Sequence, residues 1–437
     1  MVFIYTPKAY YKPFSINLNV IIPNFAISAL QNGNNVLILQ PNKCIMEAFY
    51  KTHIYLVEHV HSPVRRLLMD EIDWTRRLIG IKGSRGVGKT TFLLQYAKEN
   101  FGTDRSCLYV NFNNLYFTEH TLVEFAAEFC AQGGKTLLLD QTFKYENWSK
   151  ELRECYDRFP TLQIIFSGSS VMRLIEENTD LKDIVASYNL RGFSFREFLN
   201  LEAGTGFKSY TLNEIITHHE EIAKEICSVV HPLDYFQDYL HHGYYPFFLE
   251  DRNFSENLIK TMNMMLEVDI LLIKQIELKY LSKIRRLLYL IMNTAPAAPN
   301  ISQLSNEIGV SRATIMNYIK YLKDARLLNM LYSDGDEYPK KPTLVYVHNT
   351  NLMYTINSGH VDKAAEQKTF FYNALHACHK VNVCKYHLDF CIDQQYHFKC
   401  ENKPETGKHY SKVIYAADHI ETGNKNVIPL WLFGFLY

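Results

Sequence analysis

Between residues 77 and about 200, short runs of apolar residues alternate with segments in which apolar residues recur at helical spacing. The apolar runs predict strands at 78–81, 108–112, 136–140, 162–166 and near 184–190. The intervening segments predict helices at 89–100, 121–130 and 148–159. This alternation is typical of an α/β domain that is built on a parallel sheet.

The pattern changes after residue 206. Long apolar helical faces follow, then a loop with two prolines at 294–300 that no helix can cross, and then a compact helical unit at 301–332. The tail returns to mixed α and β character, which predicts a C-terminal α+β domain. We therefore divide the chain into five parts: an extension at 1–45, an α/β core at 46–206, a helical region at 207–293, a helical unit with its flanks at 294–342 and the tail at 343–437.

The first 45 residues contain apolar stretches that Asn and Pro interrupt. They lack the charged start, the continuous apolar stretch and the small-residue cleavage site of a signal peptide. We interpret this segment as an extension outside the main fold, or as an upstream start that precedes a true beginning at Met46.

Composition narrows the class of protein. Apolar residues make up 47% and charged residues 21% of the chain, and 46 Lys and Arg balance 46 Asp and Glu, so a surface for nucleic acid would have to be local. The nine cysteines lack paired C-x-x-C spacing, which favours reduced thiols in a cytoplasm over disulfides or zinc. No apolar run reaches about 18 residues, so we expect no membrane helix.

One motif lies between the first predicted strand and the first predicted helix. It fits G-x-x-x-x-G-K-[ST] in full, and with the residue that follows it comprises Gly83, Ser84, Arg85, Gly86, Val87, Gly88, Lys89, Thr90 and Thr91. Glycines let such a loop wrap an anion with its N–H groups inward, and the following helix adds its positive end. Lys89 supplies a charge to the β- and γ-phosphates and Thr90 a hydroxyl to Mg²⁺. The motif predicts that the chain binds a nucleoside triphosphate, and ATP is favoured because no N-K-x-D sequence that reads guanine occurs.

A second candidate residue for binding the metal ion lies 50 residues beyond Thr90. The run 136–140 is an apolar strand that ends in Asp140, as in a Walker B motif, so Asp140 is predicted to orient Mg²⁺ through its water shell. The alternative is an ordinary buried strand with a terminal aspartate.

The residue after Asp140 is Gln141, where many P-loop ATPases have a glutamate that polarises the attacking water. An amide can hydrogen-bond a water but cannot accept its proton at neutral pH. The sequence therefore predicts nucleotide binding with slow hydrolysis. Alternatively, another group or the γ-phosphate itself takes the proton, and Gln141 only positions the water.

Three further side chains are candidates for contact with phosphate. The fourth strand is followed by Ser167-Gly168-Ser169-Ser170, and Ser167 is the candidate for sensing the γ-phosphate, unless this is a plain turn of small residues. Arg191 and Arg196, beyond the fifth strand, would face a phosphate in their own or a neighbouring subunit, although most such arginines are surface or ion-pair residues.

With these pieces in place, the chain resembles the bacterial and archaeal AAA-type ATPases related to the STAND branch. The resemblance covers roughly residues 46 to 437, and the matching stretches are 77–82 running into the P-loop, 137–140, 164–170, 193–198, 243–246 and 429–434. It implies a P-loop domain with strand order 5-1-4-3-2, a helical lid at 207–293, a winged helix at 294–342 and a C-terminal domain akin to restriction-type nucleases. The departure at Gln141, where the family usually has Glu, puts turnover in doubt but not binding.

The predicted winged helix contains a helix-turn-helix pattern. A helix at 301–308 ends at Gly309, and Ser311 caps a second helix over 312–325. In a DNA reader the residues that approach the major groove would be Arg312, Thr314, Asn317 and Lys320. The window 279–341 holds ten Lys or Arg and five Asp or Glu, a modest local basic surface. The alternative is a purely structural module that packs on the lid.

In the tail, nuclease chemistry would need an Asp and a Glu that hold Mg²⁺ and a nearby Lys. By the resemblance, Asp389 stands at the first acidic position, but Lys399 stands where the Glu is expected, Lys403 matches the lysine, and Lys368 stands where an acidic residue is often found. Glu401 could replace the expected Glu only through a slip of the strand, and it would then point to the other face. We expect a dead nuclease site and a docking domain for a protein partner.

These observations favour an ATP-dependent switch of the AAA type, in which ATP bridges core and lid and closure moves the winged helix and tail. One alternative is a non-hydrolysing, ATP-loaded module that docks DNA or a protein. Another is a nuclease driven by an ATPase motor.

Overall fold

The computed structural model describes residues 41–172, 179–250, 253–356, 361–376, 378–384, 388–402 and 413–437. The chain divides into two compact units, residues 1–47 and 48–437. In the first unit the described part is the beginning of helix α1 (Pro41–His59), so the predicted boundary between 45 and 46 falls inside this helix. All that follows concerns the second unit.

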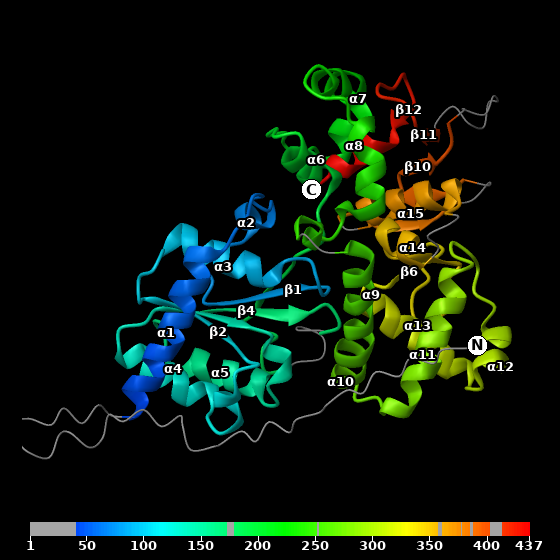
Figure 1. Cartoon of the computed structure of the whole chain (residues 1–437). Helices are drawn as coiled ribbons and strands as arrows, with labels where there is room; N and C mark the ends of the chain where they lie inside the picture. The colour runs from blue at the N-terminus through cyan, green and yellow to red at the C-terminus, as the bar shows by residue number, and fades with distance from the viewer. Residues whose placement is uncertain are drawn as a thin grey trace, which may run out of the picture. The chain divides into compact units, whose positions relative to one another are not determined.

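A five-stranded parallel sheet forms the first layer of this unit (Figure 1). Its strands are β1 (Leu78–Gly83), β2 (Cys107–Asn111), β3 (Thr136–Asp140), β4 (Gln163–Ser169) and β5 (Ala186–Asn189). The order β2-β3-β4-β1-β5 confirms both the predicted fold class and the predicted strand order. Every residue of β3 is buried, as expected for a central strand that is covered on both faces.

The helices of this part are α2 (Leu68–Glu71), α3 (Lys89–Asn100), α4 (Leu122–Ala131), α5 (Trp148–Arg158) and α6 (Phe195–Glu202), with the 3₁₀ turns η1 (Leu115–Thr118) and η2 (Thr142–Lys144). Helix α6 packs mainly on α8 (Leu233–Asp238), η3 (Tyr239–Gly243) and η8 (Leu430–Phe435). Helix α3 packs on β1, β2 and β4. A capping box starts α4, since Thr121 accepts from the Glu124 N–H and the Glu124 side chain accepts from the Thr121 N–H. The predicted helices are therefore confirmed to within two residues.

A helical region follows. Its elements are α7 (Leu212–Cys227), α8 (Leu233–Asp238), η3 (Tyr239–Gly243), η4 (Pro246–Leu249), α9 (Phe254–Met264), η5 (Met265–Ile270), α10 (Leu271–Ile273), η6 (Leu278–Tyr280) and α11 (Leu281–Met292). The segments η3 and η5 are π-helical, which is uncommon and often accompanies function.

Two short helices and a pair of strands come next: α12 (Ile301–Ile308), α13 (Arg312–Asp324), β6 (Leu328–Leu331) and β7 (Leu344–Val347). Gly309 ends α12 in the left-handed conformation at φ 70°, and the Ser311 hydroxyl accepts from the Thr314 N–H at the start of α13. The predicted helix bounds are confirmed to within one residue. Strands β6 and β7 pair antiparallel, and the predicted boundary between 342 and 343 falls between them.

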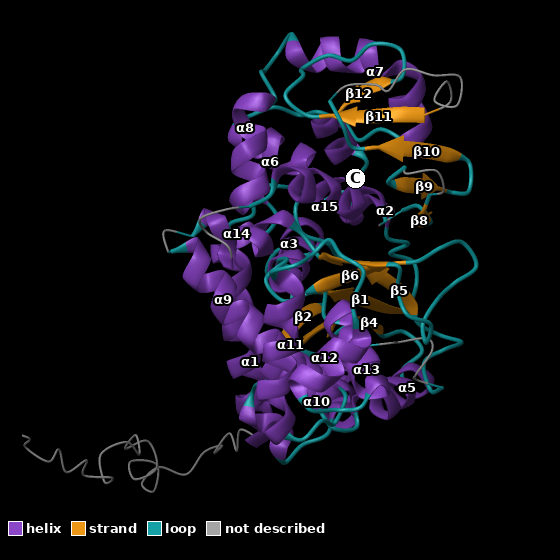
Figure 2. Cartoon of the chain, turned by 90° about the vertical axis from the view of Figure 1, so that its right-hand side faces the viewer, coloured by secondary structure: helices purple, strands orange, loops and turns teal. Residues whose placement is uncertain are grey.

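The C-terminal part has its own mixed sheet, visible at the top of Figure 2. Its elements are α14 (Thr350–Ile356), α15 (Lys363–Leu375), β8 (Val381–Val383), β9 (Phe390–Ile392), β10 (Tyr396–Lys399), β11 (Val413–Ala417), β12 (Val427–Pro429) and η8 (Leu430–Phe435). The strand order is β12-β11-β10-β9-β8, parallel on the β12 side and antiparallel on the β8 side. This agrees with the predicted α+β character of the tail.

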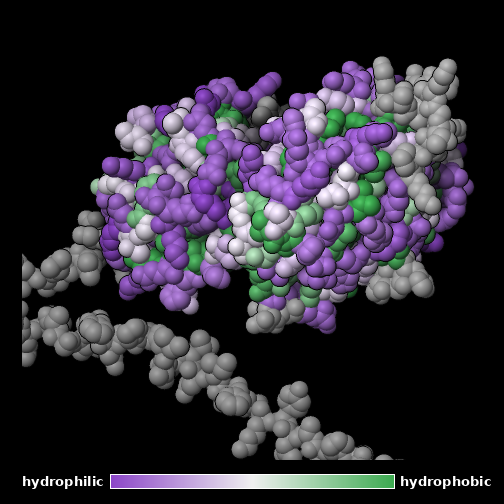
Figure 3. Space-filling model, turned by 90° about the horizontal axis from the view of Figure 1, so that it is seen from above, coloured by the Kyte–Doolittle hydropathy of each residue, from purple (hydrophilic) through white to green (hydrophobic). Residues whose placement is uncertain are grey.

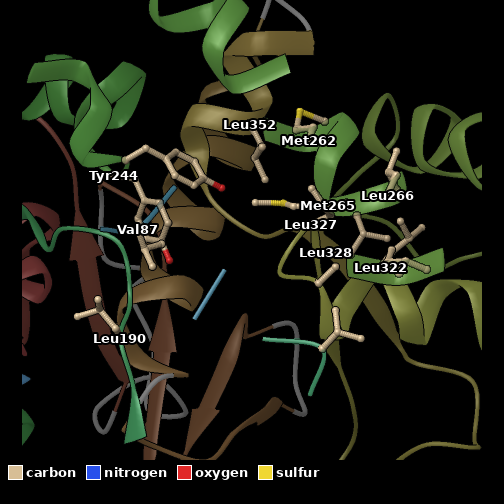
Figure 4. Close-up of a cluster of buried hydrophobic side chains, with 14 of the residues drawn as sticks. Val87, Leu190, Tyr244, Met262, Met265, Leu266, Leu322, Leu327, Leu328 and Leu352 are labelled. Carbon is tan, nitrogen blue, oxygen red and sulfur yellow. The ribbon is translucent and has the colours of Figure 1, made fainter. Parts of the chain in front are cut away.

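Two hydrophobic clusters hold these parts together. The first joins Val87 of the P-loop to side chains of η5, α13 and β6, and the second joins α6 and α7 to the C-terminal sheet and η8. Figure 4 shows part of the first cluster and labels ten of its residues, among them Met265 and Leu266 beside Leu322, Leu327 and Leu328. On the face seen in Figure 3, hydrophobic residues lie in small groups between hydrophilic ones. The core therefore runs continuously from the P-loop into α13 and β6.

Candidate nucleotide-binding site

The loop 83–90 lies between the end of β1 and the start of α3, the strand-to-helix junction that the motif requires. Gly86 and Gly88 have φ angles of 84° and 91°, a region that side chains with a Cβ disfavour. A Cβ on Gly86 would also lie 2.9 Å from the Phe247 ring. These two glycines let the loop turn back over the first turn of α3.

The Lys89 ammonium bends back along this loop. Its Nζ donates to the carbonyl oxygens of Gly83 and Ser84, at 2.8 Å each. Burial lowers the pKa of Lys89 to about 8, against the opposing effect of the carboxylates of Asp269 and Asp140. Lys89 is thus a cation held by two neutral acceptors, which it can exchange for phosphate oxygens.

The predicted metal residues lie together. Thr90 Oγ1 donates to Asp140 Oδ2 at 2.6 Å, and the side chain of Asp140 is buried. Tyr109 on β2 donates its hydroxyl to the same Oδ2 at 2.8 Å. A hydroxyl and a carboxylate in contact form the all-oxygen set that Mg²⁺ prefers. Sequence reasoning missed Tyr109, for which the only available signal was a phenol in a buried strand that needs a partner.

Gln141 follows Asp140 in the left-handed conformation, at φ 57°. Its N–H is shared between Ser167 Oγ and Asp140 Oδ1, at 3.0 Å each, and its Oε1 is buried without a hydrogen-bond partner among the described residues. Ser167 in turn donates to Asp140 Oδ1. The three residues form one hydrogen-bonded unit around the carboxylate.

The position of Ser167 differs from the expectation in one respect. We expected β4 to end at Phe166, but the strand continues to Ser169, because β1 also runs on to Gly83 and pairs with β4 as far as Ser169. Ser167 is therefore an interior strand residue that holds Asp140. Ser169, two residues later on the same side of the strand, lines the cavity described next.

A cavity of about 560 Å³ opens over the P-loop. Besides Arg85 to Thr91, its lining comprises Asp140 and Gln141, the segment 61–64, Arg66, Phe92, Gln95, Phe143, Ser169, Phe193, Pro246, Phe247, Leu249, Glu250 and Asp269. Of the predicted P-loop residues, Gly83 and Ser84 lie behind this cavity and line a smaller one of about 80 Å³. The apolar residues from 61–64 and from η4 were not predicted, because only the fold brings them to the P-loop.

A buried arginine in the wall of the cavity holds the loop in place. Arg66 Nε donates to Glu197 Oε1 at 3.0 Å, and its Nη atoms donate to the carbonyl oxygens of Val87, Arg191 and Gly192 at 2.7–3.1 Å. The side chains of Arg66 and Glu197 are 8% and 2% exposed. One guanidinium thereby ties the P-loop to the start of α6.

The two arginines proposed for contact with phosphate lie elsewhere. Arg196 is buried and donates to the carbonyl oxygens of Tyr437 and Phe207. Arg191 lies over the Tyr437 ring at 5.0 Å and lines the smaller cavity. Neither side chain lines the cavity over the P-loop.

Most of the predicted DNA-reading residues on α13 are engaged within the chain. Asn317 accepts from the Tyr338 hydroxyl, and Lys320 pairs with Asp324 at 3.1 Å. The Thr314 hydroxyl contacts Ser311 Oγ at 2.9 Å, whereas Arg312 is exposed. A duplex would have to compete with these contacts for all but Arg312.

In the C-terminal sheet the predicted acidic ligand is paired with a cation. Lys368 Nζ lies 2.7 Å from Asp389 Oδ1, and the Cys400 N–H donates to Asp389 Oδ2. Lys399 pairs with Glu401 at 3.0 Å, and Lys403 lies outside the described residues. Within the described part of the chain, the carboxylate of Asp389 therefore faces an ammonium.

Comparison with known proteins places this site in a family context. Residues 75–199 match the AAA domain family model, and residues 233–342 match a domain of unknown function, DUF8612. The P-loop part of the chain is thus an AAA-type domain. No helix in the described residues has the length and apolar character that crossing a bilayer requires.

Two curated proteins of Methanocaldococcus jannaschii are similar to this chain. The uncharacterized protein MJ1637 is 26% identical over 72% of this chain and 71% of its own length. The uncharacterized protein MJ1544 is 24% identical over 64% of this chain and 63% of its own length, so the match leaves more than a third of that relative uncovered.

Solved structures that resemble the chain are remote in sequence. AMPPCP-bound DnaA from Aquifex aeolicus is 14% identical with a TM-score of 0.24, covering 64% of this chain and 87% of DnaA. The ORC1 protein of Aeropyrum pernix in complex with DNA is 11% identical with a TM-score of 0.29, covering 71% of this chain and 92% of ORC1.

Proposed function

We propose that this chain, which carries an AAA-type P-loop domain, binds ATP with Mg²⁺ in the cavity over residues 83–91 and acts as a nucleotide-dependent switch. The observation that carries the proposal is the meeting of Lys89, Thr90 and Asp140 at one strand-to-helix junction. Loop N–H groups, the N-terminus of α3 and the Lys89 ammonium supply the positive field that phosphates require.

The remainder of the cavity suits a nucleoside. Pro63 and Val64 provide apolar surface of the kind that a purine ring needs. Pro246 and Phe247 lie against the P-loop itself, since a Cβ on Gly88 would lie 3.8 Å from Pro246 and a Cβ on Gly86 would lie 2.9 Å from the Phe247 ring. Thr90 and Asp140 would hold Mg²⁺, which would supply Lewis-acid polarisation of the phosphate oxygens.

The cavity is also lined by both the core and the helical region. Pro246, Phe247 and Asp269 come from the region after α6, whereas the P-loop and Asp140 come from the sheet domain. A ligand in this cavity would contact both parts at once, which supports a switch over a static binding module. The proposed organisation keeps the α/β core at 46–206, the lid at 207–293, the winged helix at 294–342 and the C-terminal domain at 343–437.

Hydrolysis is proposed to be slow because of Gln141. Gln141→Glu is expected to raise the rate of phosphate release at least tenfold, because a carboxylate at the cavity wall can accept the proton of the attacking water. Phosphate release at saturating Mg²⁺-ATP, with ATP affinity measured in parallel, checks this.

The outcome separates the switch from its alternative. Turnover in the wild-type chain that increases in the variant supports a slow ATPase. Turnover that occurs only in the variant favours the second candidate, an ATP-loaded module that docks DNA or a protein without hydrolysis. A Gln141→Glu protein that binds ATP but hydrolyses it no faster than wild type would contradict the role given to Gln141.

The pH dependence of binding follows from Lys89. Its pKa of about 8 in the nucleotide-free protein means that it loses its proton above that pH. Phosphate binds the protonated form, so ATP affinity is expected to be flat below pH 8 and to fall by up to roughly tenfold per pH unit above it. Titrations between pH 6.5 and 9.5 test this. Lys89→Arg is the control, because its guanidinium stays charged and its weaker affinity should not vary with pH.

DNA remains a proposed partner through α13, and a protein remains a proposed partner through the C-terminal sheet. Of the four predicted DNA-contacting residues, Arg312 is the one that is free of side-chain contacts in the described structure, which makes sequence-specific reading the weaker proposal.

A further inference from the structure

The cavity contains a carboxylate that no motif predicts. Asp269 lies in the π-helical segment η5, and its side chain is 4% exposed. Its Oδ1 accepts from Nη2 of Arg85, the third residue of the P-loop, at 2.9 Å. A segment 184 positions away in the sequence is thus joined by an ion pair to the loop that is built for phosphate.

Asp269 acts on the other cations of the site as well. Among the charges that affect Lys89, Asp269 has the largest influence, ahead of Asp140 and Arg85. Lys144, at the end of η2, experiences the same three charges. Asp269 and Asp140 are thus the carboxylates that act most strongly on Lys89, and Glu250 also lines the cavity.

A triphosphate brings several negative charges to the same cations. The phosphates and Asp269 then compete for Arg85, and like charges at close range in a partly desolvated cavity repel strongly. Bound phosphate therefore favours a position of Asp269 that is withdrawn from the P-loop.

The segment that carries Asp269 is connected to the rest of the molecule. Met265, Leu266 and Ile270 of η5 are fully buried or nearly so in the cluster shared with α13 and β6. Figure 4 labels Met265 and Leu266. Packed cores shift between discrete arrangements rather than deform continuously. A displacement of Asp269 would therefore change the packing of η5 against Leu322 and Leu328.

We propose that Asp269 is the counter-ion that a bound triphosphate displaces from Arg85, so that η5 transmits nucleotide occupancy to α13 and β6. This inference rests on the proposed function, because it takes ATP as the ligand of the cavity. It adds a residue that sets nucleotide affinity and the element through which the switch acts.

The test compares Asp269→Asn with wild type by isothermal titration calorimetry. The variant keeps the size of the side chain and removes the charge, so ATP is expected to bind at least fivefold more tightly. The gain should grow with the number of phosphates and be absent for adenosine. Glu267→Gln is the matched control, since Glu267 lies in the same segment and forms an exposed ion pair with Arg285, and its ATP affinity should equal that of wild type.

A second measurement uses the wild-type chain. Hydrogen exchange of 254–271 and 312–331 is expected to change when Mg²⁺-ATP is added, and Asp269→Asn should show much of that change without nucleotide.

Unchanged or weaker ATP binding by Asp269→Asn overturns the proposal, as does nucleotide-independent exchange in wild type. Unchanged affinity with loss of turnover would make Asp269 a proton acceptor instead. If wild type binds no ATP, the proposed function fails; if it binds normally and the variant does not differ, this inference alone fails.

Discussion

Lys89→Ala is expected to weaken ATP binding about a hundredfold or more. The ammonium is held at the P-loop by two carbonyl oxygens, so in the bound state it can turn to phosphate oxygens without leaving the loop. Truncating one partner of a desolvated charge pair costs about 2–5 kcal/mol, and roughly 2.7 kcal/mol corresponds to a hundredfold change in Kd.

Lys98→Ala is the matched control for this variant. Lys98 lies on the same helix α3, is exposed, and donates to the Val60 carbonyl at 3.1 Å. Its removal should leave the Kd for ATP within about twofold and the melting temperature nearly unchanged. Normal ATP affinity in Lys89→Ala would show that the nucleotide does not use this loop.

The second large effect concerns stability. Arg66→Ala is expected to lower the free energy of unfolding by about 3–5 kcal/mol, because it leaves the buried carboxylate of Glu197 without its cation and three carbonyl oxygens without their shared donor. Since one of these carbonyls belongs to Val87, the P-loop should loosen and ATP affinity should fall as well. Urea denaturation monitored by circular dichroism measures the stability change.

The neighbouring arginine provides the comparison. Arg65 pairs with Asp70 at the surface, where the two side chains are 48% and 61% exposed. Arg65→Ala should cost less than about 1 kcal/mol, because water replaces an exposed ion pair at little loss. Equal destabilisation by the two variants would contradict the role assigned to Arg66.

Arg65 and Arg66 show that burial of an individual side chain can escape prediction from the sequence. They are adjacent in the chain, and no local pattern distinguishes the one that becomes buried from the one that stays at the surface. The P-loop, strand β3 and the ends of α3, α12 and α13 could be predicted because their signals are local: glycine spacing, an apolar run and capping residues.

The residues that were missed depend on contacts between distant segments. Tyr109 reaches Asp140 across paired strands, and Asp269 reaches Arg85 from a helix that lies beyond the sheet domain. The length of β4 was underestimated because its last residues, Ser-Gly-Ser, have the composition of a turn. Pairing with β1 outweighs this local preference, since every position from Ile164 to Ser169 has a partner in β1.

The most direct test of the account is equilibrium binding of Mg²⁺-ATP to the wild-type chain, measured by isothermal titration calorimetry near pH 7. We expect saturable binding of one nucleotide per chain, and Lys89→Ala should abolish most of the heat. A wild-type chain that shows no binding to adenine or guanine triphosphates in the presence of magnesium would contradict the central claim that the loop after β1 holds a triphosphate.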